Sequence, residues 1–195
     1  MSPRPAAAAA MLLAASCGTP APPSPSPAPR VRLSTQDTGA NVPAIVDLYR
    51  RTCLGAPRDE GELSAAIAAS GWPFVQVQSQ DRNEPSVWRF DHGELLWFHA
   101  LGSNECYLTL DSLVSPTPAA LGAGLRVQVQ RPGLEDRSED QDRIVWVWPA
   151  DANEEMVLTI ELVPASPGRT FGAGRQRVQI QLAREPKTAA GHNPD

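Results

Sequence analysis

The chain has 195 residues, 42% of them hydrophobic, which is enough for one folded domain with a core. Its formal net charge is −5, and its cations are scattered arginines and the single lysine Lys187. This balance argues against non-specific binding to nucleic acid or to an anionic membrane surface. The sequence also contains no phosphate-binding loop and no dinucleotide-binding fingerprint.

Residues 1–16 have the layout of an export signal peptide. Arg4 supplies the positive charge, and the ten residues Ala6–Ala15 form an apolar stretch that is too short to span a bilayer. The end of this segment, Ala14-Ala15-Ser16-Cys17, resembles the lipobox of bacterial lipoproteins in its last three residues, whereas those signals prefer leucine where Ala14 stands.

The lipobox resemblance implies cleavage before Cys17 and a diacylglycerol on that cysteine. It also favours the outer membrane over the inner one, since Gly18 rather than aspartate follows. The alternatives are an ordinary secretory signal and an inert start of a cytoplasmic protein.

The next segment, residues 17–40, is rich in proline, serine and alanine and predicts a flexible tether. Twelve such residues in a polyproline-like conformation would span roughly 35–40 Å at about 3.1 Å per residue. We therefore expect a signal peptide at 1–16, a tether at 17–40, one globular domain at 41–186 and a disordered tail at 187–195.

Two helices are predicted at the start of the domain. The first covers Pro43–Leu54, with Pro43 in the first turn and Asn41 as a possible cap. The second is capped by Asp59 and ends near Ser70. We expect these helices to form a helical hairpin.

After Pro73 the apolar residues alternate with polar ones, which predicts strands. The candidate strands are Phe74–Ser79, Ser86–Asp91, Glu94–Ala100, Glu105–Asp111, Leu125–Arg131, Asp142–Trp148, Glu154–Leu162 and Gln176–Arg184. A helical turn is expected at Thr117–Leu121. The prediction is an α+β fold with the N-terminal helical hairpin packed on a mainly antiparallel meander sheet of about 7–8 strands.

Three candidate strands share a Val-Gln alternation, which predicts a sheet with one apolar and one polar face. The segments are Val75-Gln76-Val77-Gln78, Val127-Gln128-Val129-Gln130 and Val178-Gln179-Ile180-Gln181. A duplicated unit would also explain them, although no other residues repeat around them.

The three cysteines are Cys17, Cys53 and Cys106, an odd number for an exported protein. Lipidation of Cys17 would leave Cys53 and Cys106 as a disulfide pair in an oxidising compartment. A pair of buried free thiols is the alternative. No Cys-x-x-Cys spacing indicates a metal site.

Three groups of residues are candidates for a functional site. The aromatic residues of the strands would form either the core or an exposed sugar- or peptidoglycan-stacking platform, and the core is favoured. They are Trp146 and Trp148 and an aromatic hairpin made of Trp88-Arg89-Phe90 and Leu95-Leu96-Trp97-Phe98. Asp91, His92 and His99 are the titratable residues from which a hydrolase site would be built.

The third group is the acidic segment from Asp136 to Asp142, which places oxygen atoms at alternate positions, as calcium loops do. Gln141 stands where an EF-hand has glycine, so a solvated hairpin loop is the better interpretation. We assign no catalytic residue, no metal ligand and no cofactor.

The domain itself resembles small exported proteins of uncharacterised function from proteobacteria, in Cys53-Leu54, in Ser70-Gly71-Trp72 and in Cys106. This resemblance implies no activity. The sequence therefore predicts a membrane-anchored envelope lipoprotein that acts as a non-enzymatic protein- or cell-wall-binding module, in the periplasm or at the cell surface. A hydrolase, or an inhibitory or structural domain, is the alternative.

Overall fold

The computed structural model describes residues 30–55, 57, 59–77, 85–100, 103–138, 140–164 and 176–187. The predicted signal peptide, Cys17, the tether up to residue 29 and the tail from residue 188 lie outside the described residues. Val31 and Leu33 pack against the core, so part of the segment 17–40 belongs to the packed domain.

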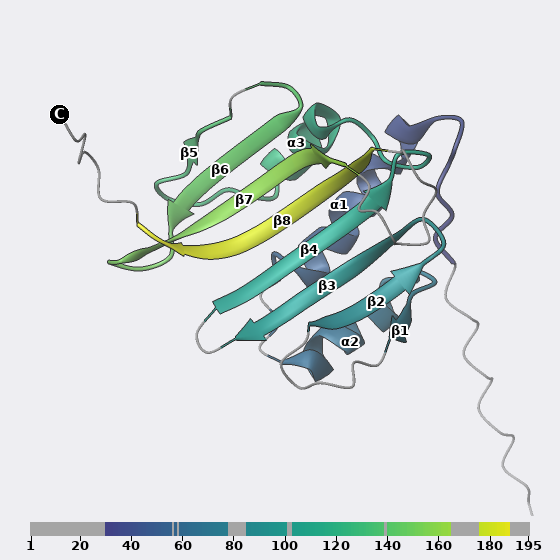
Figure 1. The fold of residues 1–195 in the computed structure, drawn as a ribbon, viewed down its shortest axis with the longest axis horizontal. Helices are drawn as coiled ribbons and strands as arrows, with labels where there is room; N and C mark the ends of the chain where they lie inside the picture. The colour runs from purple at the N-terminus through teal and green to yellow at the C-terminus, as the bar shows by residue number, and fades with distance from the viewer. Residues whose placement is uncertain are drawn as a thin grey trace, which may run out of the picture.

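The described chain forms one eight-stranded antiparallel sheet with helices on one of its faces (Figure 1). Its elements are the 3-10 helix η1 (Thr38–Asn41), α1 (Val42–Thr52), α2 (Glu60–Ala69), β1 (Val75–Val77), β2 (Ser86–Phe90), β3 (Gly93–Ala100), β4 (Ser103–Asp111), α3 (Pro118–Arg126), β5 (Glu135–Asp136), β6 (Arg143–Pro149), β7 (Glu154–Val163) and β8 (Arg177–Pro186). This confirms an α+β fold with a meander sheet. None of the described helices is long and apolar enough to span a membrane.

The strand order is β1-β2-β3-β4-β8-β7-β6-β5. It consists of two meanders, β1–β4 and β5–β8, which run inwards from opposite edges and meet where β4 pairs with β8. A helix precedes each meander, α2 the first and α3 the second. The centre of the sheet is therefore built from strands that are far apart in the sequence.

The core lies between the sheet and the helices. Because side chains alternate along a strand, every second residue of the central strands faces the helices, as Leu95 and Trp97 do in β3 and Leu108 does in β4. From the helical side, α1 contributes Ile45, Leu48 and Tyr49, all fully buried.

The structure has both predicted helices but does not support their arrangement as a separate helical hairpin. Helix α1 lies between α2 and α3 and packs against both (Figure 1). The contact with α3 is close at Gly124, where an added Cβ would meet Val42 at 2.7 Å and Val46 at 2.9 Å. Cys53, the residue after α1, is bonded to Cys106 of β4, so the C-terminal end of α1 is also fixed to the sheet.

The caps of the two helices differ from each other. Asp59 caps α2 as predicted, since its carboxylate accepts a hydrogen bond from the Glu62 amide at 2.9 Å. Asn41 occupies the N-cap position of α1, but its side chain makes no cap. Asp37 instead caps the preceding η1, and the Asn41 side chain is used for a long-range contact described below.

The segment Leu125–Arg131 is not a strand, contrary to the prediction. Helix α3 is longer than the predicted turn and takes in Leu125, which is fully buried together with Leu121. Thr117 caps this helix by accepting from the Ala120 amide at 3.2 Å. Within α3, Gly124 lies where close packing against α1 leaves no room for a side chain.

Of the three segments with the Val-Gln alternation, only β8 has the predicted buried apolar face and polar opposite face. There Val178 and Ile180 are buried, and Gln179 and Gln181 lie half-buried on the opposite face. In β1 the valines are exposed, because β1 is a short edge strand.

Candidate functional site

The face of the sheet opposite the helices is called the open face here, because no described helix covers it (Figure 1). Strand pairing arranges its side chains in rows across the sheet. One row runs from Val77 through Val87, Leu96 and Tyr107 to Gln181, and so changes from apolar to polar at the centre of the sheet.

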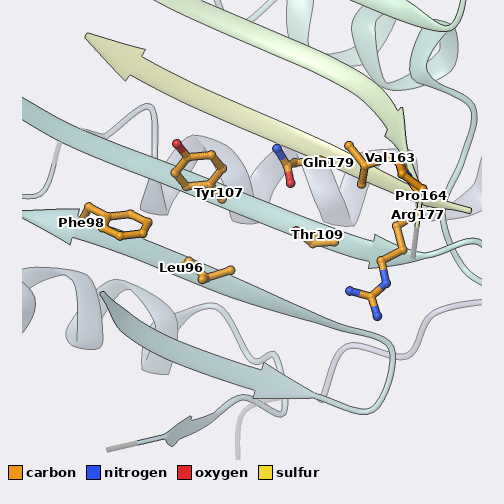
Figure 2. Close-up of a pocket in the computed structure, with 8 residues that line it drawn as sticks. All are labelled: Leu96, Phe98, Tyr107, Thr109, Val163, Pro164, Arg177 and Gln179. Carbon is orange, nitrogen blue, oxygen red and sulfur yellow. The ribbon is translucent and has the colours of Figure 1, made fainter. Parts of the chain in front are cut away.

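The centre of this face is hollowed into a groove of about 310 Å³. The groove is lined by Leu96, Phe98, Tyr107, Thr109, Val163, Pro164, Arg177 and Gln179, which come from β3, β4, β8 and the end of β7 (Figure 2). Phe98 and Tyr107 lie on neighbouring strands at one end of the groove and Arg177 at the other (Figure 2). The groove thus has an aromatic end and a cationic end.

A chain of hydrogen bonds fixes the aromatic end. The amide Nε2 of Gln181 donates to the hydroxyl of Tyr107 at 3.1 Å, and this hydroxyl donates to Oε2 of Glu105 at 2.6 Å. Burial, and then the hydrogen bond and charge of Glu105 and the charge of Glu185, raise the pKa of Tyr107 well above its ordinary value. The ring of Phe98 meets that of Tyr107 edge-to-face, with centroids 5.7 Å apart.

The cationic end carries buried charges. Arg177 is 7% exposed, and strand pairing sets it opposite Asp111. Glu94 is 2% exposed and forms an ion pair with Arg89, at 3.4 Å between Nε and Oε2. Ionised groups this far from water need partners, so these residues are best explained as structural charges.

A second hollow of about 320 Å³ lies over β6, β7 and β8 on the same face. Two ion pairs cross it, Arg137 with Glu155 and Arg143 with Glu161, each at 3.2 Å. This part of the open face is polar, and the two ion pairs neutralise Glu155 and Glu161 but not Glu185, which also lines the hollow.

The structure does not bring the candidate hydrolase residues together. Asp91 and His92 lie in the turn before β3, and His99 lies near the other end of that strand, with its side chain outside the described residues. Seven residues of strand span roughly 23 Å at about 3.3 Å per residue. Asp91 and His92 therefore lie at the opposite end of the strand from His99.

The acidic segment from Asp136 to Asp142 uses its carboxylates locally. Asp136 accepts from the Ser138 amide and from the indole Nε1 of Trp146, and Asp140 accepts from the amides of Asp142 and Arg143. The hydrogen bonds to Asp136, first of all that from the Ser138 hydroxyl, lower its pKa. No cluster of three or more metal-binding side chains occurs within the part of the chain that the structure describes.

The tryptophans belong to the core. All five are buried, Trp72, Trp88, Trp97, Trp146 and Trp148 being between 3% and 8% exposed. The alternative of a stacking platform built on Trp146 and Trp148 is therefore wrong. Of the two aromatic residues that line the groove of the open face, Phe98 belongs to the aromatic hairpin considered from the sequence, and Tyr107 was not singled out.

The disulfide between Cys53 and Cys106 is present, which confirms that pairing. Both cysteines are buried, and their Cα atoms are 5.5 Å apart. The bond joins the end of α1 to β4. Because Tyr107 directly follows Cys106 in β4, the bond also holds the helical layer against the strand that carries the aromatic end of the groove.

No protein-family model matches this chain, and no curated protein and no solved structure matches it either.

Proposed function

We propose that this protein is a membrane-anchored envelope lipoprotein whose domain binds a protein partner through its open face, without catalysing a reaction. The proposal joins the features of the N-terminal sequence to the shape of the domain. The observation that carries the binding function is the groove of about 310 Å³ on the open face, with its apolar and aromatic lining.

The Cys53–Cys106 bond supports the proposal of a lipid on Cys17. An exported protein with three cysteines has one left over, and the disulfide uses the other two. Cys17 also stands between a short apolar segment and a proline-rich one, where a lipid would anchor the chain and a tether would hold the domain away from the membrane.

A sheet face with half-buried apolar side chains is a surface that a partner can cover with a gain in free energy. Leu96, Phe98 and Tyr107 are half-buried, and Val77 and Val75 extend the apolar surface to the edge strand β1. The aromatic residues are of the type that contributes most to protein interfaces.

The position of the histidines favours binding over hydrolysis. A hydrolase that relies on a histidine base needs its nucleophile and base within hydrogen-bonding reach. His92 and His99 lie near opposite ends of β3, so they are too far apart to act together in one catalytic site.

Photocrosslinking in cells that naturally produce the chain would test the binding function. Benzoylphenylalanine placed at Phe98 should crosslink a defined envelope protein, whereas the same group at Ala65, exposed on α2, should not. Crosslinks that form equally from both positions, or only from Ala65, would contradict binding through the open face.

Mass spectrometry of the native protein would test the anchor. We expect a chain that begins at Cys17 and carries a diacylglycerol, together with the loss of two hydrogens for the disulfide. A mass that still includes residues 1–16 would refute the export argument.

A further inference from the structure

The open face carries an excess of carboxylates. Strand pairing and ion pairs place seven carboxylates and four guanidinium groups there, and Lys187 adds a fifth cation where it lines a hollow with Glu135, Arg137 and Glu155. The carboxylates are Glu94, Glu105, Asp111, Glu135, Glu155, Glu161 and Glu185, and the guanidinium groups are Arg89, Arg137, Arg143 and Arg177. A partner that covers this face must offset the excess negative charge.

The excess charge is concentrated at the aromatic end of the groove. Glu155 and Glu161 are each paired with an arginine, whereas Glu105 and Glu185 have no ion-pair partner among the described residues. Glu105 accepts the hydrogen bond of the Tyr107 hydroxyl, and Glu185 lies on the same face of β8 as Gln181, whose side chain donates to that hydroxyl. The aromatic corner, defined here as Phe98, Glu105, Tyr107, Gln181 and Glu185, therefore combines two aromatic rings with two uncompensated negative charges.

Resting on the binding function proposed above, we infer that the partner inserts an arginine or lysine side chain into the aromatic corner. Aromatic ring faces attract cations, and guanidinium groups stack on such rings while they bind carboxylates. The same chain shows this chemistry elsewhere, where Arg126 lies over the ring of Trp146 at 5.1 Å from its centroid.

The aromatic corner is preorganised for binding a cationic side chain. The Tyr107 hydroxyl donates to Glu105 and accepts from Gln181, so the tyrosine ring and the carboxylate are held in place before any ligand binds. A side chain that is already ordered loses less entropy on binding. Leu96 and Val87, which lie in the same row of the open face as Tyr107, give the partner's neighbouring apolar residues a surface to cover.

The charge also indicates which kind of partner is excluded. An anionic lipid surface would be repelled by the carboxylate excess on this face, so the membrane to which the chain is anchored is not its occupant. A basic protein segment has the required charge and apolar side chains together.

A peptide titration of the full mature chain followed by NMR would test this. The probe is acetyl-Leu-Arg-Leu-Arg-Leu-amide, and its control carries citrulline, which has nearly the shape of arginine without the charge. We expect the arginine peptide to shift the amide signals of Phe98, Tyr107 and Gln181 and to bind about tenfold more tightly than the citrulline peptide.

Two double variants with equal charge change complete the test. Glu105→Gln with Glu185→Gln should weaken binding of the arginine peptide by about tenfold, whereas Asp91→Asn with Asp142→Asn, at exposed positions outside the aromatic corner, should leave it unchanged. An equal loss in both variants, equal binding of the citrulline peptide, or binding of phosphatidylglycerol vesicles through the same residues would overturn the inference.

The outcome also separates this inference from the proposed function. If Phe98 crosslinks an envelope protein but the arginine peptide does not bind, the binding function stands and the cation site is refuted. If the peptide binds at the aromatic corner but no crosslink forms in cells, the proposed function fails while the cation site stands.

Discussion

Substitution of Asn41 by alanine should be among the most destabilising single changes in this domain. The side chain is 3% exposed and joins two distant segments. Its Nδ2 donates to the carbonyls of Ser34 at 2.8 Å and Val114 at 2.6 Å, and its Oδ1 accepts from the Ser34 amide at 2.7 Å. One residue therefore connects the chain before η1 to the loop after β4.

The magnitude follows from these three bonds. Each contributes about 0.5–1.5 kcal/mol net, and a carbonyl left buried without its partner costs about 1–3 kcal/mol. We expect Asn41→Ala to lower the free energy of unfolding by about 3 kcal/mol, which corresponds to a fall in Tm of roughly 10 °C for a domain of this size. Urea unfolding followed by the fluorescence of the buried tryptophans measures it.

Asn153→Ala is the matched control, because Asn153 is exposed and only its backbone takes part in the hydrogen bonds described for it. It should change stability by less than about 0.5 kcal/mol. Asn41→Asp would keep the acceptor for the Ser34 amide but would place a negative charge against the Val114 carbonyl. At acidic pH the protonated carboxyl group can donate to that carbonyl, so the free energy of unfolding of Asn41→Asp should then exceed that of Asn41→Ala. An Asn41→Ala protein as stable as the Asn153→Ala protein would refute the reasoning.

Three further predictions concern the packing and the charges. Reduction of the Cys53–Cys106 bond should lower the free energy of unfolding by about 4 kcal/mol, since it releases a loop of 53 residues, and a change below about 1 kcal/mol in urea unfolding with and without reductant would contradict this. Gly124→Ala should destabilise by about 1–2 kcal/mol because overpacking against α1 exceeds the gain in helix propensity, whereas Gly61→Ala on the exposed side of α2 should be neutral or slightly stabilising in the same assay. An NMR titration should find the pKa of the Asp136 carboxyl below its usual range. The lowered pKa stabilises the fold at pH values above the unfolded-state pKa, and this stabilisation is lost as the pH falls through the folded-state pKa. Asp136→Asn should remove this pH dependence of the free energy of unfolding.

Local patterns predicted most of the strands, because a strand that faces a core on one side alternates in polarity. Residues Glu105–Asp111 and Glu154–Leu162 follow this rule and lie in β4 and β7. The cap at Asp59 and the cysteine pairing also followed from local chemistry and from the count of cysteines.

The errors came from contacts between segments distant in sequence. Residues 125–131 were predicted as a strand, whereas α3 continues to Arg126 and packs closely against α1 at Gly124. Asn41 occupies the sequence position of a helix cap, but its side chain instead donates a hydrogen bond to the carbonyl of Val114, 73 residues away.

The groove was missed for the same reason. Its aromatic end combines β3, β4 and β8, and the pairing of β4 with β8 is a property of the whole sheet. Alternation in the segment 105–111 does place Tyr107 on the polar face, and this was the signal that the sequence offered.

The pairing of β4 with β8 has a consequence for how the chain acquires its structure. Of the eight described strands, the last along the chain pairs with β4 at the centre of the sheet, so each meander has an unpaired inner edge until residues 177–186 are available. Contacts between such distant segments make folding slow, and open strand edges are templates for aggregation. A chain that ends before β8 should therefore lose both halves of the sheet together rather than leave a folded N-terminal half.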